Sequence, residues 1–576
     1  MAEPQIKNRT SHFPLPRWFS RSEWQIRLLQ LTKTRGSAAE PGLVLIQIDG
    51  LSRRQLQRAL ATGHLPFLAR LLRERGYRLH SLYSGMPSST PAMTAELLYG
   101  VKGAVPSFSF YSRPSRAIFR MFDPRSARQV DQRLRAQGPP LLAGGSAYAC
   151  IYTGGAAETH FCACTMALDD LLRRRYPLRL FIILLFSLYS LVRVGVLLAL
   201  EFLLALFDCA RGLIAGQDLW KELKFVPSRV GVSILMRELA TIGAKIDVTR
   251  GLPVIYLDLV GYDEQAHRRG PGSRFAHWSL KGIDGAIARI WKAAQRSSQR
   301  PYEVWVFSDH GSEETVSYLQ RTGRTLPEAI TDVFGGAIQT FVGEHDIVGT
   351  PFHRTRRSLA GRSSIRPRVT RLRESGKPLI EHEEPIVAAM GPIGHVYIDQ
   401  ELDHDERSRV AQALIERAEI PTVTAVEDGD HIRVWTKEGQ FVLPDDAALL
   451  FPRHHPFLAE LVSDFMTLCR HPDAGDFVLW GWDRRGPPCA FSIESGSHGG
   501  PGLEETHAFA LLPADAPVRI GARGYLRPLD LRKAALEYLG RVSHYGASRL
   551  PAGSARVSAE DTAAAQIHYV RQGVII

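Results

Sequence analysis

Four short apolar runs constrain the fold of this 576-residue chain more than any other feature. They are Leu43–Ile48, Val254–Leu259, Val304–Phe307 and Ala508–Leu512. Each run is rich in β-branched or aromatic side chains, and helix-length segments separate the runs, which is typical of buried strands in a parallel sheet. We therefore predict an α/β fold, built as an α/β/α sandwich with a central, mostly parallel sheet.

Acidic and imidazole side chains follow three of these runs at the point where each run ends. Asp49 comes directly after the first run, and Asp263 lies four residues past the second. Asp309 and His310 follow the third run after one serine. Taken singly, each Asp has a simpler explanation as a helix N-cap, and each His as a core residue. Because reactive groups collect beyond the carboxyl ends of parallel strands, three such placements together favour a shared metal site.

Five short segments hold the side chains that could carry chemistry. They are Gln47–Gly50, Pro87–Pro91, Tyr262–His267, Ser308–Gly311 and Gly496–Gly500. Their candidate ligands and nucleophile are Asp49, Thr90, Asp263, His267, Asp309, His310 and His498. Mixed carboxylate and imidazole donors suit Zn²⁺, and also Mn²⁺, Fe²⁺ or Co²⁺, whereas a Ca²⁺ site is richer in oxygen ligands. Asp263 and His267 stand four residues apart, so a turn of helix aims both side chains the same way.

These motifs, in this order, resemble the alkaline phosphatase superfamily, in particular its type I phosphodiesterase/nucleotide pyrophosphatase branch. The similarity covers roughly residues 43–113, 250–315 and 490–513. Ser308–Gly311 after an apolar strand is the strongest single signal, and Tyr262–Pro271 is nearly as strong.

The resemblance implies two divalent cations and a threonine nucleophile. One cation would be bound by Asp49, Asp309 and His310, with the Thr90 hydroxyl beside it. The other would be bound by Asp263, His267 and His498. A threonine hydroxyl is a weak nucleophile, and a neighbouring cation lowers its pKa. Two cations ~3.5–4 Å apart hold the attacking and leaving oxygens in line. A phosphothreonine intermediate would then be hydrolysed by water.

The sequence also departs from the family pattern. Related phosphodiesterases carry an Asn about twenty residues after the nucleophile, which donates to a phosphate oxygen. Here the stretch Phe108–Ser112 has no Asn, and Tyr111, Ser109 or a backbone N–H are the replacements that the sequence offers. Met93 stands where nucleotide-cleaving members have a polar residue. Sulfatases of the superfamily need a modified Cys or Ser, which Thr90 cannot supply.

The charge balance favours anionic partners. The chain has 71 Lys+Arg against 59 Asp+Glu, a net charge of +12, which suits phosphate-bearing substrates and acidic lipids. We expect no specific nucleic-acid binding, and the sequence leaves the oligomeric state open. Six cysteines without a C-x-x-C pair predict buried free thiols in a reducing compartment.

A strongly apolar insertion, residues 180–207, interrupts the predicted core. A single membrane crossing would put Asp49 and Asp263 on opposite sides of the membrane, which a shared metal site forbids. The insertion is therefore a helical hairpin, a re-entrant or in-plane membrane helix, or an apolar helix buried in protein. Arginines and lysines flank it on both sides, and residues 1–40 lack a signal peptide. We therefore predict membrane association at the cytoplasmic face.

The predicted organisation alternates core and inserted segments. A basic N-terminal segment (1–40) precedes the first part of the core (41–165), the apolar insertion (166–225) and the second part of the core (226–340). A cap region (341–480), with a basic loop at 354–377 and a hairpin formed by Ile432–Trp435 and Gln440–Leu443, precedes the last part of the core (481–540) and a tail (541–576).

The favoured function is metal-dependent hydrolysis of phosphodiester or pyrophosphate bonds through a phosphothreonine, at a membrane surface. Zn²⁺ is the favoured cation and Mn²⁺ the alternative. The substrate would be a nucleotide derivative or a lipid-linked phosphodiester. One alternative is a transferase that moves a phosphoryl group onto a lipid or glycan. Another is a catalytically idle, membrane-associated scaffold.

Overall fold

The computed structural model describes residues 26–27, 31–34, 40–165, 231–334, 339–343, 385–427 and 430–541, with a few single positions between 192 and 202. Most of the apolar insertion, the basic loop 354–377 and the tail after 541 lie outside the described residues. No helix among the described residues is long and apolar enough to span a membrane.

Within the described residues, seven strands form the core sheet, in the order β2-β20-β8-β1-β7-β5-β6. At its centre β1 (Gly42–Ile48) runs parallel to β7 (Val254–Leu259) and to β8 (Tyr302–Phe307). The strands β5 (Ser146–Tyr148) and β6 (Glu158–His160) continue the sheet in parallel beyond β7. The predicted fold class, with a central and mostly parallel sheet, is confirmed.

The fourth predicted strand is antiparallel to its neighbours, whereas the sequence analysis predicted a parallel strand. β20 (His507–Pro513) is antiparallel both to β8 and to β2 (Tyr77–Tyr83). The chain reaches β20 from the loop of His498 through only the short helix α19 (Leu503–Thr506). A parallel connection needs a crossover of about a dozen residues or more, so the short connection forces the strand to run back.

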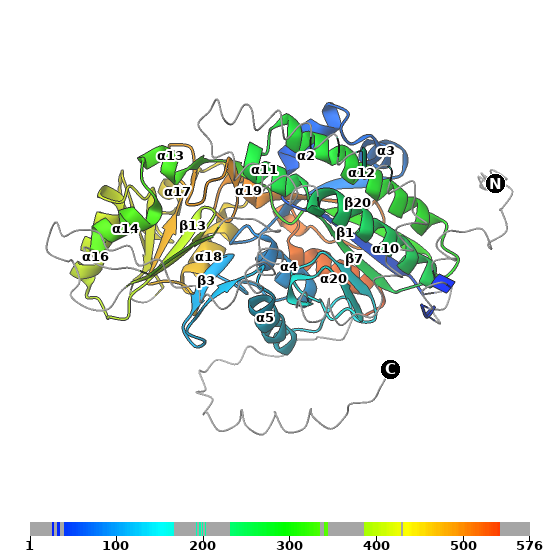
Figure 1. The fold of residues 1–576 in the computed structure, drawn as a ribbon, viewed down its shortest axis with the longest axis horizontal. Coiled ribbons are helices and arrows are strands. Elements are labelled where there is room, and N and C mark those ends of the chain that lie inside the picture. Colours follow the sequence, from blue (N-terminus) through cyan, green and yellow to red (C-terminus); the bar gives the residue numbers. More distant parts are fainter. Residues whose placement is uncertain are drawn as a thin grey trace, which may run out of the picture.

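Helices cover both faces of this sheet because the β1 side chains alternate between the faces (Figure 1). Leu43 and Leu45 pack with α4 (Thr90–Tyr99), α5 (Pro124–Gln137) and α20 (Pro528–Tyr538). Val44 and Ile46 face the opposite layer, which comprises α2 (Arg53–Ala61), α3 (Pro66–Glu74), α10 (Arg237–Arg250), α11 (Tyr262–Arg269) and α12 (Arg274–Gln295). The predicted three-layer sandwich is therefore present.

The cap region forms a second sheet, on the left of Figure 1, with seven strands among the described residues. In sheet order these strands are β11 (Gln339–Gly343), β12 (Ile386–Met390), β13 (Ile393–Tyr397), β17 (Phe477–Trp480), β14 (Thr422–Val426), β15 (Ile432–Thr436) and β16 (Gly439–Leu443). All neighbouring pairs except β11–β12 are antiparallel, and the predicted hairpin is β15–β16.

The second sheet has its own two apolar layers. On one side lie α13 (Tyr318–Thr322), α14 (Leu326–Phe334) and α16 (His404–Glu416). On the other lie α17 (Ala447–Leu450) and α18 (Leu458–Cys469). The cap is thus a sheet with helices on both faces rather than a single loop.

Short two-stranded sheets connect the main elements. β3 (Ser109–Ser112) pairs with β4 (Ala117–Arg120), and β10 (Val316–Ser317) with β18 (Cys489–Ala490). β9 (Glu313–Glu314) pairs with β19 (Gly496–Ser497), which brings the chain after His310 beside the chain before His498. The five described cysteines are buried and free, as predicted.

Candidate active site

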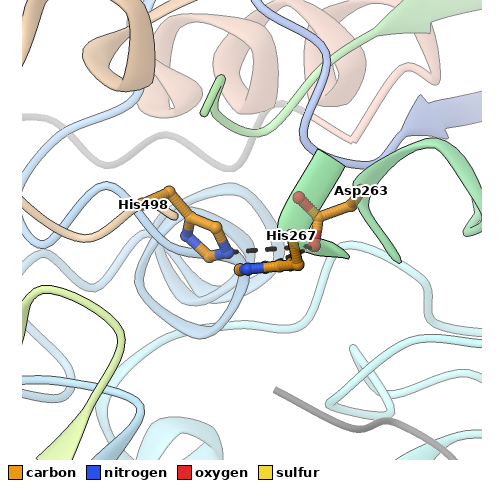
Figure 2. A group of neighbouring side chains, drawn as sticks. All are labelled: Asp263, His267 and His498. Carbon is orange, nitrogen blue, oxygen red and sulfur yellow. Dashed lines mark ion pairs between the residues drawn. The ribbon is translucent and has the colours of Figure 1, made fainter. Parts of the chain in front are cut away.

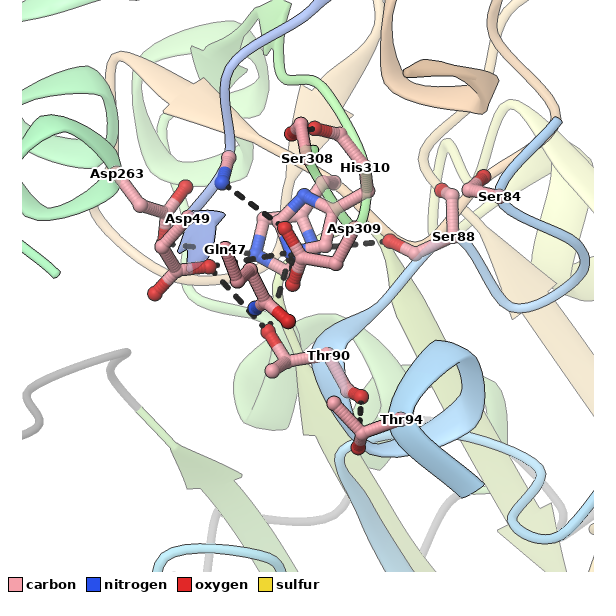
Figure 3. Close-up of polar contacts among 12 residues, drawn as sticks. Gln47, Asp49, Ser84, Ser88, Thr90, Thr94, Asp263, Ser308, Asp309 and His310 are labelled. Carbon is pink, nitrogen blue, oxygen red and sulfur yellow. Dashed lines mark hydrogen bonds and ion pairs between the residues drawn. The ribbon is translucent and has the colours of Figure 1, made fainter. Parts of the chain in front are cut away.

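The structure brings the six predicted metal ligands into two buried groups (Figures 2 and 3). Asp49 follows β1, while Asp309 and His310 follow β8, and these three form the first group. The second group, shown in Figure 2, joins Asp263 and His267 with His498. Asp263 and His267 both lie on the eight-residue helix α11, and His498 follows β19. The groups therefore assemble from segments far apart in the sequence.

In the first group, the His310 imidazole turns one nitrogen to the backbone and the other to the carboxylates. Its Nδ1 lies 2.9 Å from the carbonyl oxygen of Gly311. Its Nε2 lies 3.2 Å from Asp309 Oδ2 and 3.7 Å from Asp49 Oδ1. The backbone N–H of Gly50 donates to Asp309 Oδ1 at 3.2 Å, which fixes this carboxylate.

The second group repeats this arrangement with two imidazoles. His267 Nδ1 lies 3.0 Å from the Gly496 carbonyl oxygen, and its Nε2 lies 3.1 Å from Asp263 Oδ2. His498 Nδ1 lies 2.9 Å from the Ser88 carbonyl oxygen, and its Nε2 lies 3.8 Å from Asp263 Oδ2.

The contacts of the three imidazoles fix where their protons lie. A carbonyl oxygen only accepts hydrogen bonds, so each Nδ1 carries the hydrogen. In the neutral ring each Nε2 then directs a lone pair at a carboxylate oxygen, which is an unfavourable arrangement of two acceptors. A cation placed between them removes this conflict, and an imidazole held through Nδ1–H is the usual outer-shell support of a metal-binding histidine. The donor set therefore fits two divalent cations.

Thr90 lies beside the first group, with its side chain directed at it in Figure 3. Its Oγ1 is 3.2 Å from His310 Nε2 and 3.4 Å from Asp49 Oδ1. Thr90 is the first residue of α4, so the positive end of that helix faces the same space. The His310 and His498 rings stack with centroids 3.7 Å apart, so the two groups adjoin. The Thr90 hydroxyl therefore lies next to the first group, close to where the two groups adjoin.

The buried carboxylates concentrate negative charge. Burial raises the pKa of Asp49 well above its ordinary value, and the nearby Asp258 and Asp309 raise it further. Burial likewise raises the pKa of Asp258, with Asp309 and Asp263 adding to the effect. Burial also opposes ionisation of Asp263, but His267 and His498 outweigh it, so the pKa of Asp263 is lowered. Such a cluster is stabilised by bound cations.

The structure adds residues that the sequence analysis missed. Asp258 pairs in register with Gln47 and lies within the electrostatic reach of the ligands. Among the described residues, its buried Oδ1 has no hydrogen-bond partner. Glu494 Oε2 lies 3.2 Å from His267 Nδ1 and supports that imidazole. An aspartate inside an otherwise apolar, fully buried strand is a signal that marks Asp258 in the sequence, whereas nothing local marks Glu494.

Residues 108–112, which lack the Asn of related phosphodiesterases, serve mainly to pack the protein interior. The Tyr111 N–H donates to the Tyr397 hydroxyl at 3.0 Å, so this backbone donor is already used. Ser109 is fully buried, and its Oγ has no hydrogen-bond partner among the residues that the structure describes. Met93 is fully buried in the layer between α4 and the sheet. Of the replacements that the sequence offers, the backbone N–H of Tyr111 is therefore excluded.

Residues 250–479 match the family model for type I phosphodiesterase / nucleotide pyrophosphatase. No curated protein sequence matches the chain. Among solved structures, a phosphonoacetate hydrolase from Sinorhizobium meliloti 1021 in complex with phosphonoformate is 14% identical, with 88% of this chain and 100% of that chain covered and a TM-score of 0.42. A murine ectonucleotide pyrophosphatase / phosphodiesterase 5 in complex with AMP is 12% identical, with 88% and 98% covered and a TM-score of 0.43. The resemblance predicted from the motifs is confirmed by the family match.

Proposed function

We propose that this hydrolase, similar over residues 250–479 to the type I phosphodiesterase / nucleotide pyrophosphatase family, cleaves phosphodiester or pyrophosphate bonds with Thr90 as its nucleophile. Asp49, Asp309 and His310 would hold one divalent cation. Asp263, His267 and His498 would hold the other. When bound, the two cations supply the positive charge that lowers the pKa of a nearby hydroxyl and neutralises phosphoryl oxygens.

One observation carries this proposal. All three imidazoles give Nδ1 to a backbone carbonyl and turn Nε2 to a carboxylate, while a threonine hydroxyl lies within 3.4 Å of a member of the first group. When the rings are neutral, each Nε2 and the carboxylate opposite it are both acceptors, and a cation between them is the ligand that suits both. The arrangement supports a site built to surround cations and a reacting phosphoryl group.

The proposed reaction has two steps. Thr90 Oγ1 forms a bond to phosphorus as the bond from phosphorus to the leaving oxygen breaks, and the proton lost from the Thr90 hydroxyl ends on the leaving oxygen, which departs as an alcohol or phosphate. Water then attacks the phosphothreonine, which restores the Thr90 hydroxyl and releases the phosphorylated product. The N-terminal end of α4 favours the negative charge of the phosphoryl group in both steps.

The mixed donor set also supports an identity for the cations. Each group combines Asp oxygens with imidazole nitrogen, and the second group has two imidazoles. Imidazole-rich sites of this kind suit Zn²⁺, and Mn²⁺ is the alternative because it accepts carboxylate oxygen readily.

The test is a metal-dependent hydrolysis assay on the purified full-length chain. Wild type should hydrolyse bis-p-nitrophenyl phosphate with Zn²⁺ or Mn²⁺ added, in preference to p-nitrophenyl phosphate. Thr90→Ala should lose turnover while its metal content stays that of wild type, because its ligands remain. Thr467→Ala, on the exposed face of α18, is the matched control and should behave as wild type. Turnover by Thr90→Ala, or none by wild type, would refute the proposal; turnover only with an added acceptor would indicate a transferase.

We also propose that the chain associates with the cytoplasmic face of a membrane through residues 180–207. Within this apolar segment, Val192, Val196 and Phe202 are helical and 58%, 54% and 50% exposed. Their spacing supports one apolar helical face available to lipid. Flotation with anionic vesicles tests the idea: a chain lacking residues 178–210 should no longer float, and equal flotation of both chains would contradict the segment's role.

A further inference from the structure

Glu505 lies outside both ligand groups but holds the loop that carries His498. It is 3% exposed and belongs to α19. Its Oε2 accepts the Gly500 N–H at 2.7 Å, and its Oε1 accepts the Gly502 N–H at 2.9 Å. Its backbone carbonyl oxygen accepts the Gly311 N–H at 2.9 Å. One residue thus fixes the turn after the second-group histidine and the turn after the first-group histidine.

Glu505 reaches the nucleophile segment through Ser88. The Ser88 hydroxyl lies 3.1 Å from Glu505 Oε2 and accepts the Gly499 N–H at 2.9 Å. The Ser88 carbonyl oxygen accepts His498 Nδ1–H at 2.9 Å. Ser88 precedes Thr90 by two residues on the same segment, which Figure 3 shows facing the first group. The nucleophile and the His498 imidazole are therefore positioned by the same short network.

The packing around Glu505 leaves little freedom. A Cβ on Gly500 would lie 2.8 Å from Glu505 Oε1, and a Cβ on Gly311 would lie 2.1 Å from the Glu504 carbonyl oxygen. Both glycines are therefore required by the close approach of α19. The network is buried and closely packed, as expected where a site must hold its ligands within a fraction of an ångström.

We propose that Glu505 is a positioning residue that sets the spacing between the two cation sites. It joins the segments of Thr90 and His498 through Ser88, and the segment of His310 through Gly311. This inference rests on the proposed two-cation function. Glu505 forms hydrogen bonds with Ser88, Gly500 and Gly502 through its side chain and with Gly311 through its backbone; Glu505 thus acts through other residues. It acts on the second site through the Ser88 carbonyl oxygen, which orients His498, and on the first site through Gly311.

The geometry also predicts which substitutions of Glu505 disrupt this network. Each carboxylate oxygen of Glu505 accepts a backbone N–H. In Glu505→Gln, the amide NH₂ must therefore face an N–H donor, whichever way the amide is turned. Glu505→Gln should consequently resemble Glu505→Ala rather than wild type. Glu314→Gln, which changes an exposed carboxylate on the adjoining strand β9, is the matched control.

Co²⁺ titration of the full-length protein, followed by visible absorption and metal analysis, tests this proposal. Wild type and Glu314→Gln should bind two Co²⁺ per chain with the same spectrum. In Glu505→Ala and Glu505→Gln, one Co²⁺ should bind about 10- to 100-fold more weakly and its absorption should change, the range expected when an outer-shell partner is lost. The other Co²⁺ should keep its affinity because Asp49, Asp309 and the Gly50 N–H are unchanged.

The outcomes separate this inference from the proposed function. Two tightly bound Co²⁺ with a wild-type spectrum in both Glu505 variants would overturn the positioning role alone. If wild type binds no Co²⁺ and hydrolyses no phosphodiester, the proposed function fails together with this inference. If the Glu505 variants do not fold, Ser88→Ala replaces them, because it keeps the carbonyl oxygen that accepts from His498 and removes only the hydroxyl contacts. Ser88→Ala should also bind one Co²⁺ more weakly and the other unchanged. Unchanged binding of both Co²⁺ would overturn the proposal.

Discussion

Replacing Gly50 with alanine tests how tightly the two ligand groups are packed against each other. Gly50 has φ +69°, and its N–H donates to Asp309 in the first group. A Cβ at this position would lie 2.1 Å from Asp263 Oδ1 in the second group. Gly50→Ala therefore acts on both groups at once.

The size of the effect follows from these distances. The left-handed backbone costs about 1–2 kcal/mol for a residue with a side chain. The Asp263 oxygen must also move from 2.1 Å to at least 3.0 Å, a displacement of about 0.9 Å. A misplacement of about 1 Å lowers turnover by roughly 10²-fold, equivalent to about 2.7 kcal/mol of transition-state stabilisation.

Gly63→Ala is the matched control. Gly63 has φ +71°, but a Cβ there has no neighbour within 4 Å. It should show the backbone cost alone, as a small loss in thermal unfolding temperature with wild-type kcat/KM. Gly50→Ala should lose a similar amount of stability, about 10²-fold in kcat/KM on bis-p-nitrophenyl phosphate, and part of its bound metal. Wild-type activity and metal content in Gly50→Ala would refute the reasoning, because the clash would then be relieved without moving Asp263.

Three further predictions concern stability. Hydrogen bonding to Arg250 lowers the pKa of Glu158 to about 2 from its ordinary 4.5. The pair therefore stabilises the fold above the unfolded pKa, and this contribution is lost as the pH falls from about 5 to 2. In urea unfolding, the free energy of unfolding of Glu158→Gln should fall less steeply than that of wild type over this pH range, and parallel curves would contradict the prediction. Arg527→Ala leaves the buried Glu96 without its 3.1 Å ion-pair partner and should lower the free energy of unfolding by about 3–5 kcal/mol. Arg519→Ala, at an exposed ion pair, should lower it by less than about 1 kcal/mol. Equal losses for the two variants in urea unfolding would show that burial of the ion pair does not matter. Removing metal with a chelator should lower the thermal unfolding temperature, and Zn²⁺ at 100 times its Kd should restore about 2.7 kcal/mol, whereas an unchanged melting curve would argue against metal sites in the fold.

Local pattern was enough to predict the core strands. Leu43–Ile48 and Val254–Leu259 are apolar on both faces because helices cover both sides of the sheet, and the structure contains both as parallel neighbours. The same pattern could not give the direction of Ala508–Leu512. A buried strand has the same composition in either direction, and only the short connection through α19 decides that it runs antiparallel.

In the candidate site, too, the sequence indicated some of the residues and only the structure placed the others. The motifs identified the residues now found in two groups, because carboxylates and imidazoles directly after strands are unusual enough to recognise. Asp258 belongs to none of these motifs, and its register beside Gln47 is what places its carboxylate near the ligands. Glu494 and Glu505 carried no local signal, because an isolated glutamate in a loop or short helix looks like any surface residue. Residues 180–207 remain a prediction, since nearly all of that segment lies outside the described residues.

The sequence by itself determined the chemistry that is available: three aspartates, three histidines and a threonine in five short motifs. The tertiary structure decided which of them meet and in what orientation. His498 Nδ1 finds its acceptor on Ser88, 410 residues away, and this contact turns its Nε2 toward Asp263. No local preference specifies such a contact, because it depends on how the core sheet, α11 and α19 pack and on the requirement that every buried polar group be paired or face a cation.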